Sequence, residues 1–354
     1  MVKRPAAAAS SSGSIRKRPV QSSKGARTPA DAGSSSMEKE EDAAWALKVF
    51  AADLDGCAHD RMAADGPRVG AYARAISRAV KGRVVLDLGT GPRALLALLC
   101  ARAGAARVVA LEVVPAVAAL ARRAVAEAGF SDRIEVVVGY STLVPLPKVD
   151  LVVHEIVGNL ATEEGLASVL ADLQGRPEVV DSARPGWSLP RCVETWAAPV
   201  SLSVALPPGG EGPLPPSVLR LPCPPPPATL LGEPRLLETV DAEQPIALRQ
   251  ARRLRWLVKA AGRLGGFACA PRVAFDQYEA LDAWAAATHW RHLLVPLAAP
   301  VRVLPGDAVE LAALADLRRL PVRHAFTAAV VRAPRGPRRV PRREPLGRIE
   351  AQLR

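Results

Sequence analysis

Three carboxylates follow an apolar run in the stretch VDLVVHEIVGNLATEEG, residues 149–165. Glu155 stands directly after the run, and Glu163 and Glu164 come eight and nine residues later. Converging carboxylates repel one another unless a cation lies between them. A guanidinium suits this place, because it is always charged and offers five donors in a planar fork that carboxylates accept bidentately. We therefore expect Glu155 and Glu164 to hold a guanidinium, and Glu163 to be a solvated acid at the start of a helix.

The segments around this loop alternate between strand and helix patterns. Short runs rich in Val, Leu and Ile predict buried strands, and longer runs with helical spacing predict helices between them. The strands are expected at 83–88, 107–113, 133–138 and 149–155, and the helices at 94–104 and 115–129. Strands buried on both faces that alternate with helices are typical of a doubly wound parallel sheet, a Rossmann-like α/β fold. Ligands bind at the carboxyl ends of the strands in such sheets, which is where Glu155 lies.

A glycine turn follows the first of these strands in VVLDLGTGPR. Gly89 and Gly91 allow a ligand to approach the backbone, and the next helix points its amide groups into the same crevice. Asp87 stands where nicotinamide-binding fingerprints carry an apolar residue, and Glu112 ends the second strand, where an acid can hold a ribose diol. This combination resembles the class I S-adenosylmethionine methyltransferases and implies that these four residues bind that cofactor. A glycine turn in an unrelated α/β protein is the alternative.

The second half of the chain has a different character. Beyond about residue 185, short β-type stretches separated by Gly and Pro predict an antiparallel, β-barrel-like domain over 186–330. The Rossmann-like domain is expected over 37–185, and disordered basic tails are expected over 1–36 and 331–354. A Pro-rich stretch, 207–227, is expected to be a surface excursion.

The net charge of +12 is concentrated in the two tails. Residues 1–36 and 331–354 carry +6 each, and the body over 37–330 is formally neutral, with 32 basic and 32 acidic residues. A neutral body argues against a nucleic-acid-binding groove, so nucleic acid is expected only through the tails. The N-terminal basic run is consistent with nuclear import, with a solvated tail or with an organelle transit peptide. A nuclear or cytoplasmic location is the main expectation.

The cysteines and the apolar segments narrow the class of protein further. The five cysteines are scattered, without a CxxC or a Cys/His metal spacing, which favours a reducing compartment. No apolar run approaches the ~20 residues of a membrane-spanning helix. We therefore expect neither a metal site nor a membrane segment.

The double-acid loop and three distant motifs resemble the protein arginine N-methyltransferase family. In that family, two acids nine residues apart, with a Gly three after the first, clamp the substrate arginine; Glu155, Gly158 and Glu164 match this double-E loop. The Thr-His-Trp at 288–290 is similar to the family's THW loop, and LPGDAVE follows it at a suitable distance. HDRMAADGPRVGAY, residues 59–72, resembles the helix that covers the cofactor. The four motifs occur in the family's order.

The resemblance assigns cofactor roles in the covering helix. It implies that Arg68 binds the methionyl carboxylate of S-adenosylmethionine, with His59 and Met62 nearby. Met62 matches the members that form asymmetric dimethylarginine, whereas Leu166 replaces a second Met. The product, whether monomethyl, symmetric or asymmetric dimethylarginine, is therefore left open.

The resemblance also assigns the substrate side of the site. It implies that Asp65 pairs with His289 and takes part in catalysis with the double-acid loop, and that Thr288 and Trp290 bind substrate. The implied substrates are arginine-containing proteins, Arg-Gly-rich or histone-like segments among them. A head-to-tail homodimer is implied as well, through an arm near 207–240.

Several positions depart from the family's pattern and indicate a divergent member. The family's paired tyrosines upstream of the covering helix have no match, and Arg93 replaces the third Gly of the usual turn. His292 stands where Gln is usual, and Ser141 and Thr142 stand where an acid often meets the adenine. Two alternatives stay open on this basis: a class I methyltransferase acting on RNA or a small molecule, and a non-catalytic scaffold with a methyltransferase-like fold.

Overall fold

The computed structural model describes residues 35–52, 57–201, 218–221, 223–286, 288–335 and 340–352. The expected N-terminal tail up to residue 34 lies outside the described residues, as do residues 202–217, which include the first part of the Pro-rich stretch, and the side chain of His59. In the described part of the chain, no helix is long and apolar enough to cross a membrane. Within the same residues, no group of three or more His, Cys, Asp or Glu side chains is placed to hold a metal ion.

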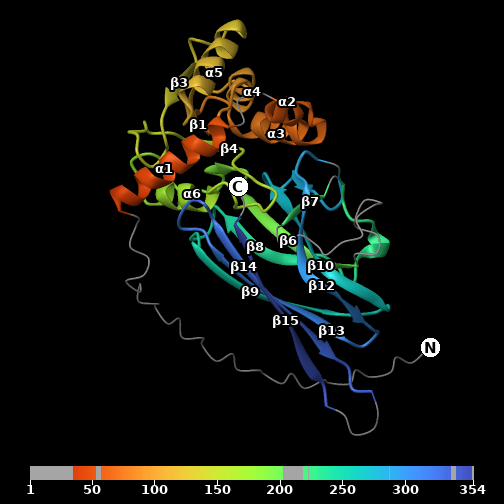
Figure 1. The fold of residues 1–354 in the computed structure, drawn as a ribbon. Helices are drawn as coiled ribbons and strands as arrows, with labels where there is room; N and C mark the ends of the chain where they lie inside the picture. The colour runs from red at the N-terminus through yellow and green to blue at the C-terminus, as the bar shows by residue number, and fades with distance from the viewer. Residues whose placement is uncertain are drawn as a thin grey trace, which may run out of the picture. The chain divides into compact units, whose positions relative to one another are not determined.

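The first half of the described chain forms a parallel sheet with flanking helices, which confirms the predicted Rossmann-like fold (Figure 1). The strand order is β3–β2–β1–β4–β5. The strands are β1 (Val84–Leu88), β2 (Arg107–Glu112), β3 (Ile134–Val138), β4 (Leu151–His154) and β5 (Ser188–Leu189). The helices are α1 (Ser36–Ala51), α2 (Cys57–Ala64), α3 (Gly66–Ala79), α4 (Leu95–Arg102), α5 (Pro115–Glu127) and α6 (Leu166–Gln174). The order reverses direction between β1 and β4, and this switch point is where such sheets bind ligands.

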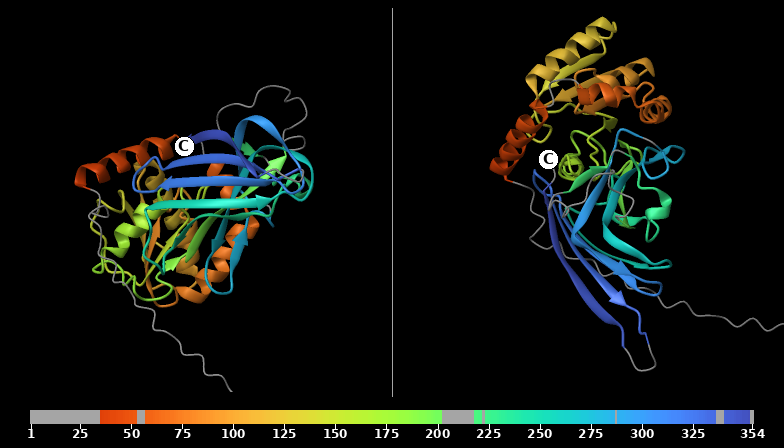
Figure 2. Two further views of the ribbon diagram at one scale, coloured as in Figure 1. Left: turned by 90° about the horizontal axis from the view of Figure 1, so that it is seen from below. Right: turned by 45° about the vertical axis from the view of Figure 1, so that its right-hand side comes forward.

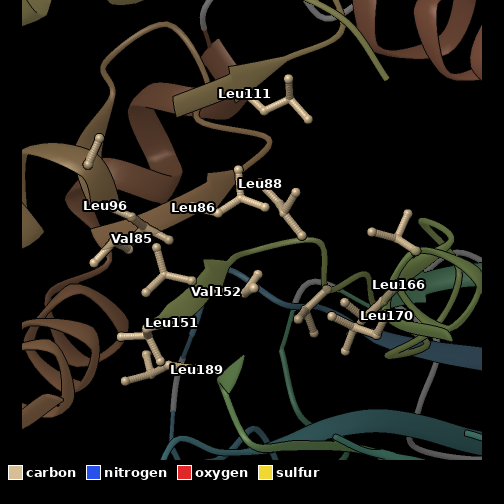
Figure 3. Packing of buried hydrophobic residues seen from close by; sticks show 14 of the residues in the cluster. Val85, Leu86, Leu88, Leu96, Leu111, Leu151, Val152, Leu166, Leu170 and Leu189 are labelled. Carbon is tan, nitrogen blue, oxygen red and sulfur yellow. The ribbon is translucent and has the colours of Figure 1, made fainter. Parts of the chain in front are cut away.

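The register of the central strands brings the two predicted motifs to one edge. Leu88, the last residue of β1, pairs with His154, the last residue of β4. The glycine turn and Glu155 therefore leave the sheet side by side at its carboxyl edge. The apolar side chains of β1 and β4 belong to one buried cluster with Leu166 and Leu170 of α6 (Figure 3). This apolar packing fixes the strand ends that carry the polar groups.

The second half forms two antiparallel sheets, as expected for a barrel-like domain (Figures 1 and 2). One sheet has the order β7–β12–β10–β6–β8, with β11 paired to β10, and the other has the order β15–β14–β13–β9. The first sheet comprises β6 (Cys192–Ser201), β7 (Leu219–Leu221), β8 (Arg235–Asp241), β10 (Gly262–Ala274), β11 (Ala280–Asp282) and β12 (His292–Val303). The second comprises β9 (Arg249–Leu257), β13 (Ala308–Asp316), β14 (Arg323–Arg332) and β15 (Arg342–Gln352), and a 3-10 turn, η2, spans Pro227–Thr229. Residues of both sheets, such as Phe267 and Phe326, share one buried core.

The prediction of a disordered tail over 331–354 is wrong for the described residues 331–335 and 340–352. Arg342–Gln352 forms β15, which pairs with β14 along its length. A bulge places Leu346 and Gly347 opposite Ala328, and Gly347 adopts a φ of +97° that suits a bulge. The bulge lets both Leu346 and Ile349 pack against the buried core while the arginines stay exposed. Leu346 and Ile349 are too few to indicate a strand in an Arg-rich sequence. The composition of this segment therefore predicts a disordered tail.

Candidate active site

The glycine turn after β1 is fixed by a buried carboxylate. Gly89 and Gly91 adopt φ of +70° and +66°, a conformation that Gly reaches without steric cost. The Asp87 carboxylate accepts hydrogen bonds from Thr90 Oγ1 at 2.7 Å and from Ala97 N at 3.1 Å. Burial raises the pKa of Asp87 to about 7, although these hydrogen bonds act in the opposite direction. Asp87 is fully buried and positions the glycine turn through these bonds, and its contact with a cofactor stays a prediction.

A crevice opens beside this turn, between the ends of β1, β2 and β4 and the helices α1 to α3. Its walls combine apolar side chains with a few charged ones. Lining residues include Phe50, Met62, Arg68, Gly89, Gly91, Glu112, Tyr140, Glu155 and Glu164. Sequence reasoning identifies most of these residues but misses Phe50 and Tyr140. Phe50 lies in the last turn of α1, which carries no cofactor motif, and the nearest signal is its position shortly before the covering helix.

The end of β2 presents its acid in a fixed orientation. Glu112 is buried, and its carboxylate accepts hydrogen bonds from Gly91 N at 3.1 Å and Val114 N at 3.0 Å. The bond from Gly91 ties this acid to the glycine turn. Glu112 can therefore accept the hydroxyls of a ribose diol beside the turn, as the sequence predicts.

An ion-pair cluster fixes α1 against the β domain. Arg319, in the turn before β14, donates to Asp42 at 3.0 Å and to Glu41 at 2.7 Å. Asp42 is buried and also accepts a hydrogen bond from Leu320 N. These contacts set the position of the helix whose last turn contributes Phe50 to the crevice.

Glu155 emerges from β4 into a buried ion pair. Its Oε1 lies 3.0 Å from Arg68 Nη1 and 3.6 Å from His289 Nε2. The preceding carbonyl, of His154, accepts a hydrogen bond from Tyr72 in α3 at 2.8 Å. Both Glu155 and Arg68 line the crevice. The acid therefore lies at the carboxyl end of the strand, as the sequence predicts, and there it pairs with Arg68 of the covering helix.

Glu163 and Glu164 have different roles, and one prediction about them is wrong. Glu164 lines the crevice with Glu155, as expected of a two-carboxylate clamp. Glu163 is not solvated: only 4% of it is exposed, and it accepts hydrogen bonds from Asn159 N at 2.8 Å and Leu160 N at 3.4 Å. A Cβ on Gly158 would lie 2.0 Å from Glu163 Cγ. Gly158 thus makes room for an internal carboxylate that folds the loop between the two clamp acids.

The Thr-His-Trp segment supports the acids from the β domain. His289 donates from its backbone N to Asp65 Oδ2 at 2.7 Å, and its Nδ1 lies 3.0 Å from the same oxygen, which confirms the predicted contact. Trp290 is buried, and its Nε1 donates to Val157 O at 2.8 Å. Thr288 Oγ1 donates to the Trp290 carbonyl at 3.4 Å. The structure therefore places Trp290 as a support of the double-acid loop, whereas substrate contact by Trp290 and Thr288 stays a prediction.

Burial determines the protonation of these groups. It raises the pKa of Glu155 to about 7, although the Arg68 charge favours the carboxylate. Burial, with the Arg68 charge, lowers the pKa of His289 to about 4. Burial also disfavours the charged form of Asp65, but hydrogen bonds from the His289 and Arg68 backbones outweigh it and lower its pKa. At neutral pH, His289 is a neutral imidazole that donates to Asp65 through Nδ1 and keeps Nε2 as an acceptor.

A second buried network joins the double-acid loop to three strands of the β domain. Glu238 of β8 accepts hydrogen bonds from Thr162 Oγ1 at 2.9 Å, Thr195 Oγ1 at 2.7 Å and His324 Nε2 at 2.8 Å. Thr195 Oγ1 also accepts from Ala161 N at 2.9 Å. Burial disfavours the Glu238 carboxylate, but the His324 charge and these hydrogen bonds outweigh it and lower its pKa. No local motif marks this network, because its members lie far apart in the chain.

The residues of the crevice carry groups that fit S-adenosylmethionine. Arg68 Nε is buried and makes no hydrogen bond among the described residues, so a donor is ready for a carboxylate. The apolar side chains of Phe50, Met62 and Leu111 offer a surface for an aromatic base. The acids Glu112 and Glu155 suit a diol and a cation, and would repel a pyrophosphate.

Two departures from the family's pattern are accommodated without closing the crevice. Arg93, in place of a Gly, points to α2 and pairs with Asp60 at 2.5 Å. Ala94, which follows, adopts a φ of +45°, a conformation that costs a non-Gly residue about 1–2 kcal/mol. His292 is buried edge-on against Trp284, with ring centroids 4.7 Å apart. The divergent residues therefore pack around the site and leave its lining open.

Part of the chain is similar in sequence to known proteins. No protein-family model matches the chain. The chain is 39% identical over 118 residues to protein arginine N-methyltransferase 1.1 of Arabidopsis thaliana, a match covering 32% of the chain and 30% of that protein. It is 37% identical over 112 residues to protein arginine N-methyltransferase 6 of Danio rerio, covering 30% of the chain and 32% of that protein. It is also 39% identical over 114 residues to the arginine N(omega)-methyltransferase of Streptomyces achromogenes subsp. streptozoticus, covering 30% of the chain and 31% of that protein.

The solved structures extend the likeness to most of the fold. The structure of Arabidopsis thaliana protein arginine methyltransferase 10 matches with a TM-score of 0.66 at 20% identity, over 81% of this chain and 96% of that one. The Trypanosoma brucei PRMT1 enzyme–prozyme complex with AdoHcy matches with a TM-score of 0.66 at 17% identity, over 84% of this chain and 98% of that one. In sequence, the chain spans about a third of the length of the curated relatives it matches. The chain therefore has the fold of the protein arginine methyltransferases and resembles them in sequence over about a third of its length.

Proposed function

We propose that the protein transfers a methyl group from S-adenosylmethionine to a guanidino nitrogen of arginine in protein substrates. The observation that carries this proposal is that Glu155 and Glu164 line the same crevice as the glycine turn and Glu112. One crevice thus joins features suited to the methyl donor and to a guanidinium. The similar Trypanosoma brucei complex contains AdoHcy, which supports the choice of cofactor.

The residues of the site would hold the two reactants in line. Arg68 would take the methionyl carboxylate and Glu112 the ribose, while the two clamp acids face the guanidinium. When bound, S-adenosylmethionine supplies an electrophilic methyl group on a sulfonium. The reaction is a displacement in which a nitrogen–carbon bond forms and the sulfur–carbon bond breaks, so positioning is the main task of the protein. Glu155 and Glu164 offset the repulsion between two cations and favour electron density on the attacking nitrogen.

The proton leaves the guanidinium during or after transfer. Free arginine has a pKa of about 13.8, so removal of its proton before attack is unfavourable. The product nitrogen can release the proton to Glu155 or to His289 Nε2, which lies 3.6 Å from Glu155 Oε1. Asp65 maintains the acceptor tautomer of His289 through the contact to Nδ1.

A labelling experiment tests the proposal directly. The full chain is incubated with methyl-labelled S-adenosylmethionine and either an Arg-Gly-rich peptide or a histone-like peptide, with Lys-for-Arg peptides as controls. Mass analysis should find methylated arginine only in the Arg-containing peptides. Label in RNA or in free arginine alone would support a different acceptor. Absence of cofactor binding by calorimetry would support a non-catalytic scaffold.

The pH dependence of substrate capture should report Glu155. Burial raises the pKa of Glu155 to about 7 in the free protein, and a bound guanidinium favours the carboxylate. Below pH 7, capture must first remove a proton, so kcat/KM should rise with pH by up to about tenfold per unit and level off above 7. The measurement is kcat/KM for an arginine peptide at saturating cofactor between pH 5.5 and 9. A flat profile from pH 6 to 8 would contradict it, and a separate titration of cofactor affinity distinguishes the contribution of Asp87.

The assembly is part of the same proposal. A head-to-tail homodimer is expected, through an arm near 207–240. In that stretch, the described residues form β7, η2 and β8, and 202–217 lie outside the described part. Light scattering of the full chain after size exclusion tests the dimer.

A further inference from the structure

The double-acid loop, residues 155–164, contains a polar residue that the proposed mechanism does not use. Asn159 follows Gly158 in this loop, and no motif marks it. It is the only asparagine among the 354 residues of the chain. Because the composition otherwise lacks this residue, the amide at position 159 calls for an explanation from its contacts.

Both ends of the Asn159 side chain are hydrogen-bonded. Its Nδ2 donates to Glu163 Oε1 at 3.1 Å, and its Oδ1 accepts from Arg291 N at 2.7 Å. The orientation of the amide follows from its partners, because a backbone N–H needs an oxygen and a carboxyl oxygen needs a donor. Arg291 directly follows the Thr-His-Trp segment and lies 132 residues from Asn159 in the chain. Asn159 therefore bridges the inside of the double-acid loop to the β domain.

Glu163 anchors the bridge from within the loop. Its carboxyl group also accepts hydrogen bonds from Asn159 N at 2.8 Å and Leu160 N at 3.4 Å. Buried backbone donors of an irregular segment need such partners. Burial raises the pKa of Glu163, although these two hydrogen bonds act in the opposite direction. The acid is therefore used inside the protein, and its contact with Asn159 holds the amide in place.

The β-domain segment grips the loop at neighbouring positions. Trp290 Nε1 donates to Val157 O at 2.8 Å, and the next residue, Arg291, donates to Asn159. His289 directly precedes them, and its Nε2 lies 3.6 Å from Oε1 of the first clamp acid. Of the two hydrogen bonds to the loop, only the one to Asn159 uses a side chain of the loop. A substitution at position 159 can therefore loosen this grip without altering a clamp acid.

Stabilisation of a local turn explains only half of these contacts. It accounts for the hydrogen bond to Glu163, four residues away, but not for the one to Arg291. The second contact joins the two segments that meet around the clamp. In the described part of the chain, Asn159 is not among the residues that line the crevice. It can therefore act on the reaction only through the residues that it positions.

We propose that Asn159 is a positioning residue for arginine methylation, which fixes the double-acid loop against the Thr-His-Trp segment. The bridge sets the spacing between the clamp acids and His289. This inference rests on the proposed methyl transfer and extends it to a residue outside the crevice. Because a misplacement of about 1 Å can cost about 10²-fold in rate, loss of the bridge should lower kcat by about 10- to 100-fold.

Steady-state kinetics of the full chain test the proposal, with an Arg-Gly-rich peptide and saturating S-adenosylmethionine. Asn159→Ala removes both contacts. Asn159→Asp keeps the shape and the acceptor for Arg291 N, but it places a carboxylate where the donor to Glu163 was. Both variants should lose kcat by the stated factor. Cofactor affinity, measured by calorimetry, should stay close to that of the wild type, because Arg68, Glu112 and the glycine turn lie outside the bridge.

Gln174→Glu is the matched control for a purely structural effect. It makes the same change from amide to carboxylate at an amide that donates to Ala242 O at 3.0 Å and to Gln244 O at 2.8 Å. This amide lies at the end of α6 and is not among the described residues that line the crevice. The control should lose stability in denaturant unfolding and keep the kcat of the wild type. All assays are run well below the unfolding transition of each variant, and Asn159→Asp carries the test if Asn159→Ala does not fold.

A double-mutant cycle tests whether Asn159 and Glu163 act as one unit. If they do, Asn159→Ala/Glu163→Ala should lose about as much kcat as Asn159→Ala alone. Losses that multiply would overturn the bridge. A kcat like that of the wild type in both Asn159 variants, or an equal loss in Gln174→Glu, would overturn the positioning role and leave the proposed function standing. Neither turnover nor peptide binding by the wild type would overturn the proposed function, and the role of Asn159 with it.

Discussion

Glu164→Gln is expected to lower the turnover of arginine methylation by about 10²- to 10³-fold, the loss typical of removing one group that stabilises charge in a transition state. The substitution keeps the shape of the side chain but removes the charge that we propose faces the guanidinium. Cofactor affinity should change little, because the residues assigned to the cofactor are Arg68, Glu112 and the glycine turn. The measurement combines single-turnover methylation of an arginine peptide with calorimetry of cofactor binding.

Glu155→Gln separates the two acids of the clamp. Glu155 also lies 3.0 Å from Arg68, so its neutralisation should change cofactor affinity as well as turnover. Glu127→Gln is the matched control, since the Glu127 side chain is 63% exposed on α5 and pairs with the exposed Arg123. Turnover near that of the wild type in both clamp variants would rule out the guanidinium clamp. Cofactor binding with no turnover in the wild type would instead support a scaffold.

The difference between Glu163 and Glu164 shows where sequence reasoning fails within one motif. The spacing of Glu155 and Glu164 predicts a clamp, and both line the crevice. Glu163 has the composition signal of a helix start, yet it turns inward to the backbone of Asn159 and Leu160. Only the space left by Gly158 permits this, and a sequence does not reveal which neighbour fills the space beside a glycine.

The parallel sheet could be predicted because its signals are local. Buried strands, helical spacing and a glycine turn each occupy a few consecutive residues, and their order fixes the topology. β15 could not be predicted in this way. It is stabilised by pairing with β14 and by the contacts of Leu346 and Ile349 with a core that other strands build. Tertiary contacts of this kind override composition.

The limited extent of the sequence similarity explains why motifs could not predict the hydrogen-bond network around Glu238. The sequence resemblance covers about a third of the chain, whereas the fold resemblance covers 81–84% of it. Much of the fold is therefore matched at only 17–20% identity to solved relatives. Glu238 of β8 and His324 of β14 lie 86 residues apart in the chain and in different sheets, and they meet through a buried side-chain hydrogen bond. Their role must be argued from this chain's own geometry.

His324→Leu is expected to destabilise the protein by about 3–5 kcal/mol, because it leaves Glu238 as a buried carboxylate without its partner. Both side chains are almost fully buried, with 2% and 1% exposed. Replacing both residues, in Glu238→Leu/His324→Leu, should cost less than the sum of the single changes, since no buried charge is left unpaired. Denaturant unfolding of the three variants measures the coupling. Additive costs would show that the two residues do not act as a pair.

The stability lost in His324→Leu should also depend on pH, and the direction of that dependence gives a second test. In the wild type, the pKa of Glu238 is lowered, so its contribution to stability is present above about pH 4.5 and is lost as the pH falls through the folded value. In His324→Leu, burial acts on Glu238 without the opposing interaction with His324 and raises the Glu238 pKa, so stability is lost as the pH rises. The stability difference between wild type and variant should therefore grow with pH from about 4.5 upward. Thr162, which donates to Glu238 at 2.9 Å, carries the effect to the double-acid loop, so kcat should fall more than cofactor affinity. A difference that shrinks as the pH rises would show that Glu238 is not the titrating group.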